Sequence, residues 1–264
     1  MSGSWVTALC LGLFAWPAIA EPAALTPDKV NETNNPLTPK ITAELQDVYV
    51  GSYYDLSDTR SNTLLVRGLL PFTLLGLPQI LRATLPIVTT PNHPLEATTG
   101  LGDLDLFDLF LFKAGPVELG LGPQFSFPTA TDDRTGTGKW QVGAAGVALA
   151  TLRWGLLGAF VNWQRSFAGD NARPTQSVLQ VQPLLTYNLG AGFYARSTAV
   201  WSFDLEQGTK LIPVGLGFGK VWLLEGGTTL NLFIEPQITA MSDGISPRWQ
   251  IFAGLNSQLP IGSR

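Results

Sequence analysis

The chain is poor in the residues that build disulfides, metal sites and nucleic-acid surfaces. Among its 264 residues there is one cysteine, Cys10, and one histidine, His93. An intrachain disulfide is excluded, and a zinc site needs three or four nitrogen or sulfur ligands that these two residues cannot supply. The sequence also has no basic tract of the kind that binds nucleic acid. We therefore predict no metal, no cofactor and no nucleic-acid partner.

Charge is scarce as well. Charged residues make up 14% of the chain, whereas a soluble domain has about a quarter. Hydrophobic residues make up 45%, and 28 glycines and 19 prolines accompany them. A soluble helical protein rarely combines these properties, but a multi-stranded β protein or a membrane barrel does, because each strand needs a turn.

The first residues predict a secretory signal peptide over 1–20. The stretch 5–20 is uncharged and mostly apolar, and it ends in the small-residue cleavage pattern "AIA". A buried or membrane helix is the alternative, because no Lys or Arg precedes this stretch. Residues 21–40 are polar and rich in Pro and Asn, which indicates a flexible periplasmic leader.

Beyond Ala20 no uncharged run resembles a transmembrane helix. The nearest is 68–81, which Pro71 and Pro78 interrupt and which Arg67 and Arg82 bound. If the chain crosses a membrane, it does so with strands.

Alternation with a period of two residues dominates the sequence from about residue 41 onward. In the stretch 117–127 the apolar residues occupy every second position, and Glu, Gly, Gln and Ser fill the others. Such alternation places the two sets on opposite faces of a strand. We predict twelve strands of this kind, roughly at 42–50, 61–73, 79–89, 101–113, 117–128, 139–151, 155–167, 176–188, 192–203, 210–222, 228–240 and 248–259.

The links between these strands alternate between short and long. Short links such as "AGP" and "LRW" follow long polar links such as 90–100 and 129–138. This is typical of outer-membrane barrels, whose periplasmic turns are short and whose extracellular loops are long. We therefore predict an all-β fold over 41–264, a transmembrane up-and-down antiparallel barrel. A soluble sandwich, or a soluble secreted lipid-binding barrel of the lipocalin kind, is the alternative.

Several motifs resemble one known family. They are "TGLGDLDLF" (99–107), "GLGPQFSFPTATDDRTGTGKWQVG" (120–143), "SFAGD" (166–170) and "VGLGFGKVW" (214–222). They resemble a bacterial family of outer-membrane transporters, often labelled MetA-pathway of phenol degradation and in some members neuromedin U-like. The resemblance covers about 40–260. It implies a β-barrel in the Gram-negative outer membrane that passes small, often aromatic compounds, and it names no catalytic residues.

Two features could suggest a nucleotide site or a catalytic site, but neither fits the pattern that such a site requires. The segment "TGTGK" ends like a phosphate-binding loop, but Asp133 and Trp140 stand where the motif needs Gly and Ser or Thr. His93 lies in a loop without a nearby serine, so a catalytic pair is not indicated. We predict that the protein is not an enzyme.

The inward face of the strands then carries the candidate site. We expect Asp103, Asp105, Glu118, Gln124, Arg196 and Glu235 to line the lumen and to set selectivity, and Asp132, Asp133 and Arg134 to guard the extracellular entrance. The predicted function is passive passage of small organic solutes, with outer-membrane lipid and the barrel-assembly machinery as partners. The alternative is a structural or adhesion barrel with a filled lumen.

Overall fold

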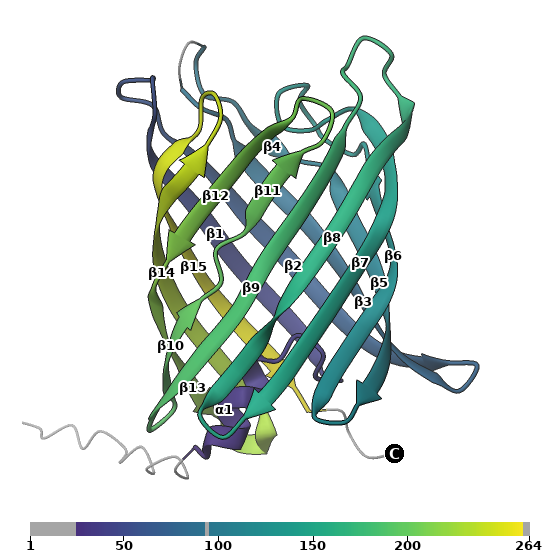
Figure 1. Cartoon of the computed structure of the whole chain (residues 1–264), viewed down its shortest axis with the longest axis vertical. Coiled ribbons are helices and arrows are strands. Elements are labelled where there is room, and N and C mark those ends of the chain that lie inside the picture. The colour runs from purple at the N-terminus through teal and green to yellow at the C-terminus, as the bar shows by residue number, and fades with distance from the viewer. Residues whose placement is uncertain (1–24, 93–94, 261–264) are drawn as a thin grey trace, which may run out of the picture.

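A computed structural model describes residues 25–92 and 95–260 and shows a closed antiparallel β-barrel (Figure 1). The predicted signal peptide over 1–20 and His93 lie outside the described residues. Twelve strands form the wall, which confirms the predicted fold class. The last strand, β15 (Pro247–Leu259), pairs along its length with the first, β1 (Ile41–Tyr53), and this pairing closes the barrel.

Each strand of the wall runs antiparallel to its neighbours in the sequence. Uninterrupted strands between the first and the last are β2 (Ser61–Leu74), β3 (Leu77–Thr89), β6 (Val117–Phe127), β7 (Lys139–Leu152), β8 (Gly155–Gly169), β9 (Ser177–Gly190) and β14 (Thr229–Ser242). Three strands are interrupted: β4 (Thr99–Leu101) with β5 (Leu104–Ala114), β10 (Phe193–Ser197) with β11 (Trp201–Asp204), and β12 (Thr209–Gly215) with β13 (Gly217–Leu223).

The two ends of the barrel differ as the link lengths predict. Two-residue turns join β5 to β6 and β7 to β8 at the end drawn lowermost in Figure 1, called the lower end here. Loops such as 128–138 lie at the upper end.

The two faces of the wall differ in polarity. On β6, Leu121 and Phe125 are exposed on the outside while Gln124 and Ser126 are buried inside. The apolar phase of the strand therefore faces outward. No helix among residues 25–92 and 95–260 has the length and apolar character needed to cross a bilayer.

The segment before β1 differs from the flexible leader expected over 21–40. From residue 25 on it is structured, and it contains helix α1 (Pro27–Asn34) at the lower end of the barrel (Figure 1). The Thr26 side chain caps the helix and Pro27 occupies its first turn. Val30 and Leu37 are buried in two apolar clusters formed with the barrel wall. These contacts with distant strands order a segment whose composition alone favours disorder. The segment 25–40 is called the plug below.

Asp108 is a carboxylate in the apolar, outward phase of β5. Its neighbours Phe107 and Leu109 are buried on the inner side, and the register against β3 runs unbroken through Asp108. No bulge turns it inward, and its Oδ1 has no hydrogen-bond partner among the described residues. A carboxylate in this phase faces lipid, which destabilises a barrel.

We expect Asp108→Leu to raise the free energy of unfolding by about 1 kcal/mol, because it removes a charge from the lipid face. Urea unfolding in phospholipid vesicles measures the change. The reverse substitution Leu106→Asp, in the same phase of the same strand, should lower stability. A loss of stability in Asp108→Leu would mean that the carboxylate has a compensating partner.

Candidate functional site

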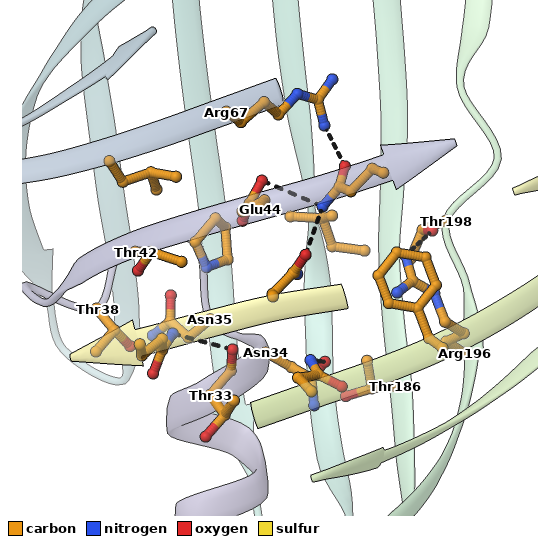
Figure 2. A pocket seen from close by; sticks show the side chains of 18 of the residues that line it. Thr33, Asn34, Asn35, Thr38, Thr42, Glu44, Arg67, Thr186, Arg196 and Thr198 are labelled. Carbon is orange, nitrogen blue, oxygen red and sulfur yellow. Dashed lines mark hydrogen bonds between the residues drawn. The ribbon is translucent and has the colours of Figure 1, made fainter. Parts of the chain in front are cut away.

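Polar side chains from the inward phase enclose two cavities inside the barrel. The lower one has a volume of about 110 Å³ and is lined by the wall and by the plug (Figure 2). The upper one has a volume of about 320 Å³. Arg67, Arg82 and Gln182 line both. The two cavities therefore meet at these three side chains.

Charged groups of the upper cavity come from one side of the wall. Cross-strand pairing places Glu44 of β1, which lines the lower cavity, beside Arg67 of β2, and Thr84 of β3 beside Asp105 of β5. Since Arg67 is also paired with Thr84, these four positions form one row across four strands. Strands β6, β8 and β9 complete the cavity with neutral amides, from Gln124, Asn162, Gln164, Gln180 and Gln182.

Arg82 and Asp105 line this cavity, and each has a buried polar atom without a hydrogen-bond partner among the described residues. The Arg82 guanidinium lies over the Phe107 ring, 4.1 Å from its centroid, and 5.3 Å from that of Phe160. Neither Arg82 nor Asp105 forms an ion pair within the part of the chain that the structure describes, and Arg82 Nε and Asp105 Oδ1 have no hydrogen-bond partner there. The upper cavity is therefore bordered by two aromatic rings and by polar side chains whose hydrogen bonding is incomplete within the described residues.

Glu235 is the most enclosed charge of the lumen, with no exposed surface. Its carboxylate accepts hydrogen bonds from Arg196 Nε at 2.9 Å, Thr198 N at 2.9 Å, Thr198 Oγ1 at 2.8 Å and Gln237 Nε2 at 3.1 Å. Arg196 lies over the Phe233 ring, 3.6 Å from its centroid. Every lone pair of the carboxylate thus meets a donor, so this ion pair is a fixed structural element of the lumen wall.

Two glycines make room for Glu235. A Cβ at Gly215 would lie 2.9 Å from the Glu235 carboxylate, and one at Gly217 would lie 2.7 Å from its Cα and Cβ. Between these glycines the strand is interrupted, and the neighbouring strand is interrupted at Thr198, where the carboxylate accepts the backbone N–H. Gly215 and Gly217 of the "GLGFG" stretch are therefore required by the Glu235 side chain, whereas a Cβ at Gly219 would meet the Tyr194 ring.

The plug is tied to the wall by side-chain amides. Asn31 Nδ2 donates to the Leu152 carbonyl at 3.0 Å, and Asn231 Nδ2 donates to Asn34 Oδ1 at 3.0 Å. Asn35 Nδ2 donates to the Glu118 carboxylate at 2.9 Å. Glu118, expected to set selectivity, therefore holds the plug at the lower end.

An ionic cluster joins helix α1 to the chain just before β1. The Glu32 carboxylate forms ion pairs with Lys29, at 2.9 Å, and with Lys40. Burial alone would raise the pKa of Glu32, but the hydrogen bonds from Lys40 and Lys29 outweigh it and hold the pKa below its ordinary value. The charged form of Glu32 thus stabilises the folded plug.

The remaining acidic candidates lie at the upper end. Asp103 is buried, and its Oδ2 accepts hydrogen bonds from Thr137 N and Thr137 Oγ1, both at 2.7 Å. Its Oδ1 accepts one from Ala130 N at 3.3 Å. Asp103 therefore holds the loop 128–138 in place instead of lining either cavity.

The loop residues form the rim of the upper end. Arg134 donates to the Glu96 carbonyl and to Thr98 Oγ1, both at 2.8 Å. It therefore joins the loop 128–138 to the loop that follows β3. Asp132 Oδ1 accepts the backbone N–H of Arg134 at 2.8 Å. Asp133 is exposed and pairs with Arg173 at 3.3 Å. The three predicted entrance residues lie at this rim, where they fasten loops to one another.

The structure thus divides the predicted lumen residues into three groups. Asp105 and Gln124 line the upper cavity, Arg196 and Glu235 form one ion pair, and Glu118 and Asp103 hold the plug and a loop. Their role in selectivity stays a prediction.

Sequence reasoning missed Arg67 and Arg82 as lumen residues, although both stand in the inward phase of their strands. It also missed the plug, although the pattern Thr26–Pro27–Asp28 is typical of a helix start.

The chain matches no protein-family model and no curated protein sequence. The solved crystal structure of the COG4313 outer membrane channel from Pseudomonas putida F1 is similar to it, with a TM-score of 0.63 over 85% of this chain and 98% of that chain. The two sequences are 14% identical, so the likeness concerns the fold. The finer resemblance to the MetA-pathway family stays a prediction.

We expect Arg196→Met to lower the free energy of unfolding by about 3 kcal/mol, because it leaves the Glu235 carboxylate buried without its cation. The temperature at which the heat-modifiable gel band unfolds reports the loss. The double variant Arg196→Met/Glu235→Gln should recover part of it. A change below about 0.5 kcal/mol in the single variant would contradict the structural role of the pair.

The ionic cluster predicts that the plug loosens in acid. A depressed pKa means that Glu32 contributes stability above its ordinary value of 4.5, and that the contribution is lost as the pH falls through the lower folded value. Hydrogen exchange of the α1 amides, corrected for the intrinsic dependence on pH, should accelerate in that range. Glu32→Gln should exchange faster at neutral pH and lose the extra acid dependence. Equal pH profiles for the two proteins would refute the role of Glu32.

Proposed function

We propose that this protein is an outer-membrane channel through which small organic solutes pass passively. The observation that carries the proposal is the upper cavity with its polar lining, enclosed by a barrel whose outer face is apolar. The similarity in fold to a COG4313 outer membrane channel supports it. The lower end, with its short turns, would face the periplasm, and the predicted signal peptide would direct export.

The chemistry of the upper cavity indicates a small, mixed solute. Its volume of about 320 Å³ lies at the lower end of the range of roughly 300–1,000 Å³ for ligand cavities. Phe107 and Phe160 offer aromatic faces, and Arg82, Asp105 and five amides offer hydrogen bonds. An aromatic or otherwise apolar body with one or two polar groups suits such a lining. This agrees with the solutes that the family resemblance implies.

The plug favours a second candidate, a structural or adhesion barrel. Helix α1 and the residues after it occupy the lower end, and Val30 and Leu37 are nearly inaccessible there. A barrel that is filled for stability alone would have this feature too. The two candidates differ in whether displacing the plug changes permeability.

The double variant Val30→Asp/Leu37→Asp tests the channel proposal. Charges at these two buried positions are incompatible with the apolar clusters, so the plug should leave the lumen. Planar-bilayer recordings should show a potassium chloride conductance at least about threefold above that of the wild type.

Pro27→Asp serves as the control, because Pro27 is exposed on the same helix, and its conductance should equal that of the wild type. Liposome swelling with phenol-sized solutes should follow the same order. If neither the wild type nor the double variant conducts, while both migrate as folded barrels, the channel proposal fails and the structural barrel is favoured.

A further inference from the structure

One lysine stands on the outer face of the barrel near its lower end. Lys220 belongs to β13, and cross-strand pairing places it beside Phe193 of β10 and Leu232 of β14. Phe193 and Leu232 are exposed, whereas Val221, the next residue of β13, is completely buried. Lys220 therefore stands in the outward phase of the strand, among apolar side chains.

Two aromatic rings hold the Lys220 ammonium. Its Nζ lies 4.2 Å from the centroid of the Phe193 ring and 5.5 Å from that of the Trp222 ring. Rings at such distances attract a cation through their quadrupole. The charge is therefore presented at one defined place on the outer surface. Lys220, Phe193 and Trp222 are called the Lys220 cluster below.

The Lys220 cluster has the position of an interfacial belt. Phe193 is the first residue of β10, directly after the turn at the lower end, and Trp222 is the last but one of β13 (Figure 1). Trp154, in the turn before β8, stacks on Tyr187 of β9 with ring centroids 6.0 Å apart at the same end. Aromatic residues gather where the acyl chains meet the headgroups. The cluster therefore stands at the depth of the lipid phosphates.

The charge of Lys220 has no acidic counterpart within residues 25–92 and 95–260, where it forms no ion pair. Glu225, in the link after β13, forms none there either. Arg165, a cation in the outward phase of β8, differs because it pairs with Glu206 at 3.1 Å. A cation on the lipid face is least costly near the interface, where headgroups accompany it. A lipid phosphate is the anion that the surroundings offer at this depth.

The Lys220 cluster spans two strands whose pairing is interrupted. β10 pairs with β13 from Phe193 to Arg196, and β11 pairs with β12 from Ser202 to Asp204. Between these two stretches the neighbouring strands form no cross-strand pair with each other. Phe193 and Lys220 form the pair nearest the lower end. A ligand that contacts both side chains therefore reinforces a short stretch of pairing.

The plug packs against the inner side of the same two strands. Tyr194 of β10 and Val221 of β13 are buried in one cluster with Val30 of the plug. The Tyr194 hydroxyl donates to Asn231 Oδ1 at 2.6 Å, and Asn231 in turn donates to Asn34 of the plug at 3.0 Å. Holding β10 against β13 from outside therefore stabilises the surface that receives the plug.

We propose that the Lys220 cluster binds the phosphate of an anionic phospholipid in the periplasmic leaflet of the outer membrane, and that the bound lipid clamps β10 against β13. The ammonium meets the phosphate, and the two rings lie beside the glycerol and the first carbons of the acyl chains. The periplasmic position rests on the orientation given with the proposed function. A zwitterionic lipid carries its own cation, which competes for the phosphate, so a lipid with net negative charge binds more tightly.

Thermal unfolding in vesicles tests the site. Vesicles of phosphatidylcholine are compared with vesicles in which a third of the lipid is phosphatidylglycerol with the same acyl chains, and heat-modifiable gel migration reports the melting temperature. We expect phosphatidylglycerol to raise the melting temperature of the wild type by about 3 °C. Lys220→Gln should lose this difference. Lys220→Arg should keep most of it, because arginine retains the cation.

Lys113→Gln is the matched control, because Lys113 is an exposed lysine at the same end of the barrel on a distant strand, β5. It should keep the full difference. Free glycerol 3-phosphate, added to the phosphatidylcholine vesicles, should leave the melting temperature unchanged, because it lacks acyl chains. An equal effect of phosphatidylglycerol on the wild type and on Lys220→Gln would overturn the site. An equal effect of free glycerol 3-phosphate would overturn the lipid as its ligand.

Native mass spectrometry measures binding without relying on stability. Wild-type protein released from micelles that hold equal amounts of the two lipids should retain phosphatidylglycerol in about fivefold excess over phosphatidylcholine. Lys220→Gln should retain the two lipids equally. Equal retention by the wild type would overturn the preference for an anionic lipid.

Hydrogen exchange of the α1 amides tests the clamp. In the wild type these amides should exchange more slowly in the vesicles with phosphatidylglycerol, and in Lys220→Gln at one rate in both. An unchanged rate in the wild type would overturn the clamp. None of these measurements involves transport, so the conductance of the double variant Val30→Asp/Leu37→Asp decides the channel proposal separately.

Discussion

The structure depends on one constraint: inside a bilayer every backbone N–H and C=O group must find a partner within the protein. Closure of β15 onto β1 meets it for most of the wall. Where two strands are interrupted, a side chain takes over, because Glu235 accepts the backbone N–H of Thr198. The buried Glu235 carboxylate in turn needs Arg196, which neutralises its charge, and Gly215 and Gly217, which leave room for its side chain.

The lower end satisfies the same constraint in a different way. Here the plug contributes the donors, because Asn31 binds the backbone carbonyl of Leu152 at the end of β7 and Asn35 binds the Glu118 carboxylate of β6. Leu37 adds apolar packing, because it lies in the buried cluster that includes Phe107 and Leu109 of β5. A segment that precedes the first strand therefore completes the hydrogen bonding and the apolar packing at this end of the barrel.

Much of this fold could be predicted, because strand alternation is a local property of the sequence. The strand expected at 117–128 is β6 at Val117–Phe127, and the last strand expected at 248–259 is β15 at Pro247–Leu259. The plug escaped prediction because Val30 and Leu37 gain their burial from strands far away in the sequence. The strand break at Thr198 escaped it for the same reason, since its backbone N–H is bound by the distant Glu235 carboxylate; the break at Leu216 lies between the two glycines that make room for Glu235.

The candidate site shows where such reasoning stops. Alternation places carboxylates on the inner face, but it does not tell which of them already accept hydrogen bonds from other groups of the protein. Asp103 and Glu235 bind backbone amides, and Glu118 binds Asn35, so these carboxylates are held by the protein itself. Beside the upper cavity, Asp105 and Arg82 each have a buried polar atom without a hydrogen-bond partner among the described residues. Because a buried polar group without a partner is destabilising, these two side chains lower the stability of the wall where they border the upper cavity, whereas the fully bonded charges do not.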